Sequence, residues 1–285
     1  MRFWTGLHLI WASFALTTFV KTSSFAGATL DEVLRTGELL APYPEISPPY
    51  VLKDNKGRLT GFDVEVLGEI GRRLGVQVRY VTREDGSNYN WEEQTSGRWQ
   101  GKYDIVVNGM TPTAERAEKL VFPATYYYSL GVLTVHQQNR TIRALSDANG
   151  KRIGVVKAAN SELYLRREFS GIIDVSPVAY QIENPVIATY DQEDKAFEAL
   201  ADRELDGVMS YLPAAVAQIK RGKPFRVIGQ PAYRVPQAVA IMPGDPEFAD
   251  LLTTIVDGMH ADGTLRNLSV EWFEFDLTGR EIPGG

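Results

Sequence analysis

The residues of this chain that could do chemistry gather in the segment 103–116, which reads Y-D-I-V-V-N-G-M-T-P-T-A-E-R. The β-branched run at 105–107 predicts a buried strand that ends at Asn108 and delivers a loop. Thr111 then supplies a hydroxyl, and the guanidinium of Arg116 is a planar fork of N–H donors that matches a carboxylate. We therefore predict an anion-binding corner. The alternative is that Arg116 pairs with a neighbouring glutamate on a solvated face.

Composition excludes several other kinds of site. The chain has 285 residues, 44% of them hydrophobic, and a net charge of −6, which is typical of one large or two medium globular domains without a basic surface for nucleic acid. It contains no cysteine, which removes disulfides, thiolate metal sites and a cysteine nucleophile. The three histidines, at positions 8, 136 and 260, lie far apart in the sequence. We therefore predict no nucleic-acid partner, no metal and no cofactor.

Residues 1–26 have the pattern of a secretory signal peptide. Arg2 gives a basic start, residues 7–20 are mostly apolar, and residues 24–26 form a small-x-small cleavage pattern. The apolar run is shorter than the roughly 18 to 20 residues that a membrane span requires, so we favour cleavage over the alternative, a weak membrane anchor. The prediction is a mature protein in the periplasm.

Short strands alternate with helices from residue 28 onward. The expected strands are 38–42, 76–81, 103–107, 130–135, 152–156, 174–180, 206–211, 225–228 and 237–242, and the expected helices are 30–35, 62–74, 161–169, 191–200, 213–219, 246–261 and 263–273. This alternation predicts an α/β fold with mixed, mostly parallel sheets covered by helices on both faces.

The order of the elements predicts two lobes. The first would comprise 27–135 plus 238–285, and the second 136–237. One strand at 130–135 and another near Ala238 would cross between the lobes, and two crossing strands make a hinge that can close a cleft on a small molecule. Asn108 would lie at the carboxyl end of a strand, where open α/β sheets bind their ligands.

Three motifs together carry a family resemblance. They are G-F-D-V-E at 61–65, G-M-T-x-T-x-x-R at 109–116, and A-D-G-T-L at 261–265 followed by E-W-F at 271–273. In this order and spacing the chain resembles the periplasmic solute-binding proteins of polar amino-acid ABC transporters, the extracellular solute-binding proteins of family 3. The resemblance implies a type II periplasmic-binding-protein fold that captures a small carboxylate-bearing ligand, an amino acid or an amino-acid derivative, and presents it to an ABC transporter permease. We expect a monomer without enzymatic activity.

The resemblance also implies roles for residues of the first lobe. Arg116 would hold the α-carboxylate of the ligand. The groups expected to assist it belong to the preceding loop: Asn108, the Met110 backbone and Thr111. Tyr50 and Trp91 match the aromatic residues that sandwich the ligand in this family, and the alternative for both is core packing.

The second lobe departs from the family pattern at the start of a helix. Where the family has Gly-Thr-Thr or Gly-Thr-Ser, this chain has Ala-Ala-Asn-Ser at 158–161. Asn160 or Ser161 can still cap the helix and donate to the ligand carboxylate, and a helix N-terminus favours an anion.

A second departure concerns the α-ammonium group of an amino acid. The family places an acidic residue at the end of the strand 206–211, where this chain has Tyr211. A buried ammonium without a counter-charge is costly, so Glu45, Asp191 or a cation–π contact with Tyr211 would have to replace that acid. The alternative is a ligand that lacks a free α-ammonium.

Two other functions stay open on this fold. Some secreted dehydratases of the cyclohexadienyl or arogenate type share it, and residues 30–34 resemble their start. Their chemistry needs a general acid from the second lobe, for which Glu162 is the only carboxylate near the predicted anion loop. An accessory protein of a periplasmic dehydrogenase is the third possibility, and the presence of Arg116 argues against it.

Overall fold

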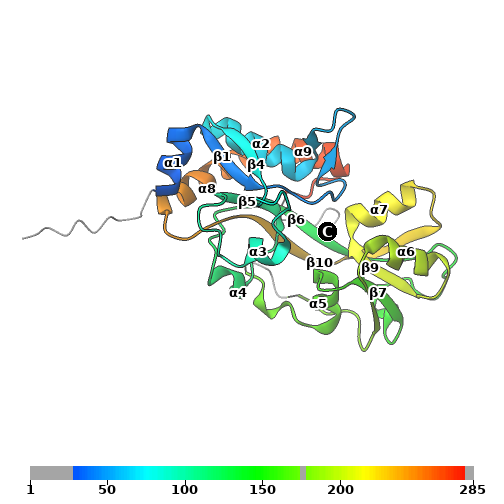
Figure 1. The fold of residues 1–285 in the computed structure, drawn as a ribbon. Coiled ribbons are helices and arrows are strands. Elements are labelled where there is room, and N and C mark those ends of the chain that lie inside the picture. The colour runs from blue at the N-terminus through cyan, green and yellow to red at the C-terminus, as the bar shows by residue number, and fades with distance from the viewer. Residues whose placement is uncertain (1–27, 174–177, 280–285) are drawn as a thin grey trace, which may run out of the picture.

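The computed structural model describes residues 28–173 and 178–279 (Figure 1). The predicted signal peptide, 1–26, lies outside these residues. Within them, no helix is both long enough and apolar enough to cross a membrane. The described chain forms two groups of elements joined by two long strands, β6 (Thr125–His136) and β10 (Phe225–Ile241).

The first group of elements is built around helix α2 (Phe62–Leu74). Its apolar positions recur at helical spacing, and Phe62, Val66 and Ile70 are fully buried against the rest of the group. The helix ends at Gly75, whose φ of 76° is a left-handed conformation that glycine adopts without strain. The other elements of this group are α1 (Ala28–Thr36), β1 (Glu38–Pro42), β2 (Leu52–Lys53), β3 (Leu59–Thr60), β4 (Gln77–Val81), α3 (Trp91–Thr95), β5 (Ile105–Met110), α4 (Ala114–Ala117), α8 (Pro246–Ala261) and α9 (Thr264–Phe273).

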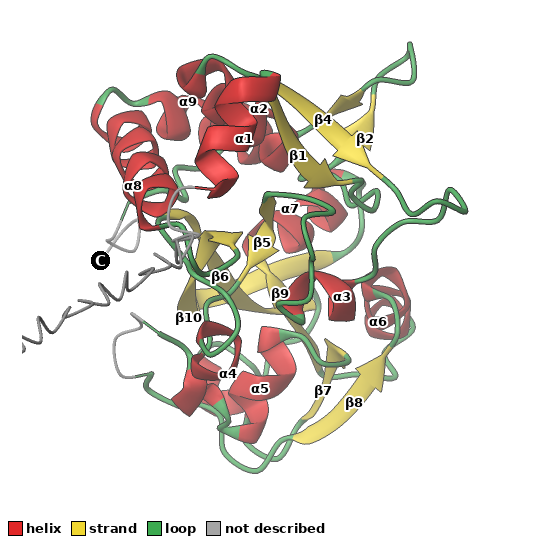
Figure 2. Cartoon of the chain, turned by 60° about the vertical axis from the view of Figure 1, so that its left-hand side comes forward, coloured by secondary structure: helices red, strands yellow, loops and turns green. Residues whose placement is uncertain are grey.

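The second group lies at the other end of the crossing strands. Its elements are a 3-10 turn (Leu145–Ala148), β7 (Arg152–Val156), α5 (Asn160–Arg166), a second 3-10 turn (Phe169–Gly171), β8 (Val186–Tyr190), α6 (Glu193–Ala201), β9 (Gly207–Tyr211) and α7 (Leu212–Lys220). Figure 2 shows β7 and β8 at the opposite end of the molecule from α1, α2 and α9.

A mixed six-stranded sheet runs through both groups in the order β5-β10-β6-β9-β7-β8. Strand β7 is parallel to β8 and β9, and β1 is parallel to β4 in a separate two-stranded sheet. Every pair that includes a crossing strand is antiparallel: β10 with β5, β10 with β6, and β6 with β9. The sheets are therefore mixed, as predicted, and β2 and β3, away from the crossings, are also antiparallel. Strands β6 and β10 run in opposite directions because β6 leaves the first group and β10 returns to it.

One predicted strand, 174–180, is tested only at its end. Residues 178–180 form no strand, and 174–177 lie outside the described part of the chain. The partner of β7 is instead β8, whose Val186 pairs with Arg152 and whose Tyr190 pairs with Val156. Pro177 already weakens the predicted segment as a strand, because proline cannot donate to a sheet ladder.

The buried side chains separate into clusters that follow the two groups. One cluster joins 33–130 with 239–277, and two others lie within 132–235. Helices α8 and α9 bury Leu252, Val256 and Phe273 in the first of these clusters, so the C-terminal helices return to the first group as predicted.

Gly131 on β6 provides a test of the packing at the crossing. A Cβ added there would lie 2.1 Å from two ring atoms of Tyr233, which is buried, so the ring would have to move. We expect Gly131→Ala to lower the free energy of unfolding by about 1–3 kcal/mol. The matched control is Gly68→Ala on α2, where an added Cβ meets open space and alanine favours the helix by up to about 1 kcal/mol. Thermal unfolding followed by circular dichroism measures both, and equal midpoints for the two variants would contradict this packing.

Candidate functional site

The predicted anion corner lies at the end of β5, but the strand runs on to Met110 instead of ending at Asn108, so Asn108 and Met110 are strand residues and only Thr111 and Arg116 follow it. Ile105 and Val106 are fully buried, and Gly109 has a φ of 55°. Asn108 donates through Nδ2 to Oε1 of Gln94 at 3.0 Å. The Asn108 side chain near the end of the strand is thus held in place by Gln94.

Arg116 lies on α4, with its guanidinium half-buried. Its Nη1 donates to the carbonyl of Thr111 at 2.7 Å, and its guanidinium carbon is 5.1 Å from the centroid of the Trp91 ring. Burial lowers the pKa of this guanidinium, although a guanidinium stays charged at neutral pH. Trp91 itself is 42% exposed, so it covers the guanidinium from the solvent side rather than packing in a core.

The alternative of a surface ion pair for Arg116 does not hold. Glu115 pairs with Lys119 at 3.0 Å instead. Across 28–173 and 178–279, no carboxylate lies within ion-pair distance of the Arg116 guanidinium. The side chain that the sequence singled out is therefore a partly buried cation without a charged partner in the described chain.

The two groups of elements meet at this corner. Asn160, at the start of α5, donates through Nδ2 to the Thr111 hydroxyl at 3.0 Å and to the Tyr211 hydroxyl at 2.9 Å. Gln237 on the crossing strand β10 donates to the same Thr111 hydroxyl at 3.1 Å. The backbone N–H of Ile173 donates to the carbonyl oxygen of Pro112 at 3.0 Å. Helix α4 lies beside α5 in both views (Figures 1 and 2). Four residues of the predicted site, Arg116, Thr111, Asn160 and Tyr211, are thus brought together.

Tyr211 lies within reach of both groups. Its pKa is raised to about 12, chiefly by burial, while the hydrogen bond from Asn160 lowers it. The charge of Arg116 lowers the pKa of Tyr211 and the charge of Glu193 raises it. The phenol therefore stays neutral at physiological pH, with a cation and a carboxylate near it.

Two predicted residues turn their side chains toward the core. The Met110 side chain is fully buried with Trp99 and Tyr103, and only the Met110 backbone was predicted to take part. Ser161 is buried and accepts a hydrogen bond from the Tyr233 hydroxyl at 3.3 Å, so its hydroxyl serves the second group's core.

Tyr50 is half-buried in the first group. Its ring centroid lies 5.1 Å from that of Phe273 and 5.9 Å from that of Tyr127. Burial raises the pKa of Tyr50 most, and the charges of Asp63, Tyr211 and Glu193 raise it further. Tyr50 thus packs against rings of the first group's core, as the alternative for this residue predicts.

The two acids that the sequence suggested for an ammonium group are both exposed. Glu45 lies on the loop before Tyr50, and Asp191 lies two residues before α6. Within 28–173 and 178–279, neither forms a hydrogen bond or an ion pair with Tyr211.

Glu193 is the acid that sequence reasoning missed. It is the first residue of α6 and is half-buried. Burial, and then the charge of Asp194, raise its pKa to about 7. Its charge in turn raises the pKa of Tyr50, Tyr211 and Tyr233. Little in the sequence indicates this burial, because an acid in the first turn is what a helix normally carries on its solvated face.

Asp63 is a second buried acid that was missed, and it holds the anion corner in place. The backbone N–H of Gly109 donates to the Tyr126 hydroxyl at 2.8 Å, and that hydroxyl donates to Oδ1 of Asp63 at 2.8 Å. Burial raises the pKa of Asp63 to about 7, although the Tyr126 hydrogen bond lowers it. A sequence signal existed here, since Asp63 lies in helical register with the apolar Val66 and Leu67.

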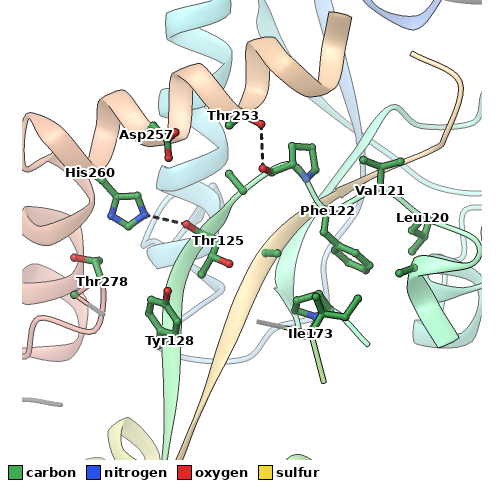
Figure 3. Close-up of a pocket in the computed structure, with 16 residues that line it drawn as sticks. Leu120, Val121, Phe122, Thr125, Tyr128, Ile173, Thr253, Asp257, His260 and Thr278 are labelled. Carbon is green, nitrogen blue, oxygen red and sulfur yellow. Dashed lines mark hydrogen bonds between the residues drawn. The ribbon is translucent and has the colours of Figure 1, made fainter. Parts of the chain in front are cut away.

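A cavity of about 890 Å³ lies apart from these residues (Figure 3). It is bounded by α8, by 120–125 and by Ile173. His260 contacts the carbonyl of Thr125 at 2.9 Å, and Thr253 donates to the carbonyl of Pro123 at 3.0 Å. The predicted site residues are not among those that line this cavity, and no cluster of acidic or histidine side chains fit for a metal occurs in the described residues.

Comparison with known proteins identifies the relatives of this chain. The family described as "Bacterial extracellular solute-binding proteins, family 3" matches residues 43–275. A probable amino-acid ABC transporter-binding protein of Haemophilus influenzae is 24% identical over 95% of this chain and 98% of its own length. An L-cystine-binding protein of Escherichia coli K12 is 27% identical over 93% of each chain. The solved structure of an ancestral cationic amino acid solute-binding protein has a TM-score of 0.68 and 26% identity, and covers 86% of this chain and 99% of that chain.

The raised pKa of Asp63 makes stability depend on pH. The folded pKa of about 7 exceeds the ordinary 3.8, so between these values the folded protein binds a proton that the unfolded chain does not, and stability falls as pH rises through 7. We expect the wild type to lose about 2 kcal/mol between pH 5.5 and 8 relative to Asp63→Asn, whose amide cannot titrate. Urea unfolding at both pH values measures this. Parallel pH dependence in the two proteins would refute a buried, titrating Asp63.

Proposed function

This chain belongs to the bacterial extracellular solute-binding proteins of family 3, and from that premise we propose that it captures an amino acid or an amino-acid derivative between its lobes for uptake by an ABC transporter. The family and the two-lobed type II fold, both predicted from the motifs, are confirmed by the match over 43–275 and by the similarity to a solved amino acid solute-binding protein. The protein acts by binding rather than by catalysis, as its curated relatives do.

The observation that carries the proposal is the state of Arg116. It is a half-buried guanidinium with one carbonyl acceptor and a covering indole, and it has no carboxylate partner within the described chain. Taking such a cation partly out of water is unfavourable unless an anion meets it. A ligand carboxylate is the natural partner, because the planar fork of N–H donors binds two carboxylate oxygens at once.

The other groups of the proposed site surround that carboxylate. In this proposal Asn108, the Met110 backbone and Thr111 belong to the carboxylate end, and Tyr50 and Trp91 flank the ligand. Asn160 donates from the second lobe, and its existing bonds to Thr111 and Tyr211 support closure of the two lobes around the site. We place the lobe boundaries at 27–135 plus 238–285 and at 136–237, with β6 and β10 as the hinge.

The cellular context completes the proposal. Known names of relatives include an amino-acid ABC transporter-binding protein and an L-cystine-binding protein, which favours an amino acid as the ligand class. We further propose that residues 1–26 direct export and are cleaved. The mature protein would then act as a periplasmic monomer whose protein partner is the transporter's permease.

Substitution of Arg116 tests the carboxylate role. We expect Arg116→Ala to weaken binding of the tightest L-amino acid by about 100-fold or more, because a buried charge pair loses one partner. Arg116→Lys keeps the charge but loses the planar fork, so we expect its affinity to lie between those of the wild type and Arg116→Ala. The matched control is Arg72→Ala, which removes a 70% exposed arginine paired with Glu69 on α2. Isothermal titration calorimetry gives the affinities, and undiminished binding by Arg116→Ala would refute the proposal.

One observation gives the dehydratase alternative a test of its own. Glu162 does not suit a general acid, because Ala158 N–H and Arg166 hold its carboxylate and lower its pKa. Glu193, with a pKa of about 7, does have the acidity that such chemistry needs. We expect no aromatic product when the protein is incubated with prephenate or arogenate, as followed by chromatography. Turnover that disappears in Glu193→Gln would overturn the binding-only function.

A further inference from the structure

The cavity of about 890 Å³ has a polar side and an apolar side. Figure 3 shows Asp257, His260 and Thr278 toward one side of it and Leu120, Phe122 and Ile173 toward the other. Most other residues of its described lining are alanine, proline, valine or threonine. Cavities of this size that are largely apolar and carry a few polar groups are typical of small-molecule sites.

Helix α8 is held at a fixed position along one wall of this cavity. The Thr253 hydroxyl donates to the carbonyl of Pro123 at 3.0 Å, and Nε2 of His260 lies 2.9 Å from the carbonyl of Thr125. Asp257 lies between these two anchors, about one helical turn from each. Because both anchors fix α8 against 123–125, the cavity is present before any ligand arrives.

The polar side of the cavity carries a negative charge. Among the described residues of its lining, Asp257 is the only aspartate, glutamate, lysine or arginine. Asp257 is exposed, and it forms no hydrogen bond or ion pair with any residue of 28–173 or 178–279. It also lies in the last five residues of α8, where the negative end of the helix dipole favours a cation.

His260 adds an acceptor to the same side. A carbonyl oxygen only accepts, so Nε2 carries the hydrogen in the contact with Thr125, and Nδ1 of the neutral ring is left as an acceptor. This nitrogen has no hydrogen-bond partner in the part of the chain that the structure describes. A carboxylate and a ring nitrogen together suit a head group that donates hydrogen bonds and carries a positive charge.

The opposite side of the cavity suits an apolar body. Leu120 and Phe122 line it, and Ile173 is 41% exposed although it is a large apolar side chain. Covering such surface with an apolar group is favourable by about 25 cal/mol per Å². The cavity therefore combines a surface for an apolar group with a place for a cation.

We propose that this cavity is a second binding site, separate from the Arg116 corner, that takes a small amphipathic amine whose ammonium group pairs with Asp257 and whose apolar body covers Phe122 and Ile173. The proposal goes beyond the proposed function and does not depend on it. Pro112 and Ala117 line the cavity, whereas Thr111 and Arg116 belong to the corner. The two sites are thus close neighbours that select opposite charges.

The first experiment titrates the full chain at pH 8 with phenethylamine, phenethyl alcohol and hydrocinnamate, which share an aromatic body and differ in head-group charge. Proton NMR follows the imidazole signals of the three histidines, at 8, 136 and 260, and His260→Gln assigns the signal of His260. Phenethylamine should shift the His260 signal saturably and leave that of His136 unchanged. It should bind about 3-fold or more tightly than the alcohol, as expected for an ion pair near the surface, and hydrocinnamate should bind least.

The second experiment separates the head group from the body. Asp257→Asn should lower the affinity for phenethylamine to that for the alcohol. The matched control is Asp250→Asn, which makes the same change about two turns earlier on α8, outside the lining, and should keep the preference for the amine. Phe122→Ala should weaken the amine and the alcohol alike, by about 3-fold or more, and leave their ratio unchanged.

Thermal unfolding checks that the variants fold. The midpoint of Asp257→Asn should equal that of wild type, because the substitution removes an exposed carboxylate without a partner in the described chain. This measurement separates loss of the amine site from loss of the fold.

Three results would overturn the inference: no saturable shift of the His260 signal, equal affinities of wild type for the amine and the alcohol, or an unchanged preference in Asp257→Asn. Arg116→Ala distinguishes the two proposals, since it should lose amino acids and bind phenethylamine as wild type does. Loss of phenethylamine binding in Arg116→Ala would place the amine at the corner and would also refute the second site. None of these results changes the test of the carboxylate role of Arg116.

Discussion

The central physical constraint in this structure is the cost of holding an ion away from water without a counter-ion. Arg116 on the first lobe and Glu193 on the second are both half-buried, and neither forms an ion pair in the part of the chain that the structure describes. Their charges are opposite, yet they act on a common neighbour, Tyr211, rather than on each other. A protein that only needed stability would pair or expose such groups. In the proposed function, a ligand carboxylate supplies the counter-ion that Arg116 lacks.

The scaffold around these ions explains how they are kept in place. Two crossing strands connect the lobes, and β5 pairs with β10, so the anion corner is attached directly to the hinge. Gly109 is tied to Asp63 through the Tyr126 hydroxyl, a contact between segments distant in sequence. Asp63 is itself a buried acid that stability alone would not favour. The buried Asp63 therefore lowers the stability of the fold while it holds the shape of the loop that presents Arg116.

The hydrogen bonds of Asn160 connect the second lobe to the first and also hold the Tyr211 hydroxyl. This side chain reaches Thr111 on the first lobe and Tyr211 on its own lobe. The family pattern offers a hydroxyl-bearing residue near this position, and the amide here can instead donate twice from one nitrogen. The change of residue type at 160 thus keeps two hydrogen-bond contacts at the place where the two lobes meet.

Much of the architecture and one half of the site could be predicted from the sequence. Local spacing alone determines the periodicity of strands and helices, the three motifs and the position of Arg116 after β5. These features can therefore be recognised in the sequence. The end of the strand predicted at 174–180 forms no strand, and β7 pairs with 186–190 instead, because a short apolar run does not say which partner it will pair with. Residues far apart in sequence decided the rest: that Met110 faces the core, that Ser161 bonds to Tyr233, and that Glu193 is half-buried while Glu45 is exposed. The burial of a side chain and the charges around it are set only when the lobes fold and meet. In the sequence, an acid in the first turn of a helix therefore looks like an ordinary solvated residue, and only the tertiary structure removes it from water.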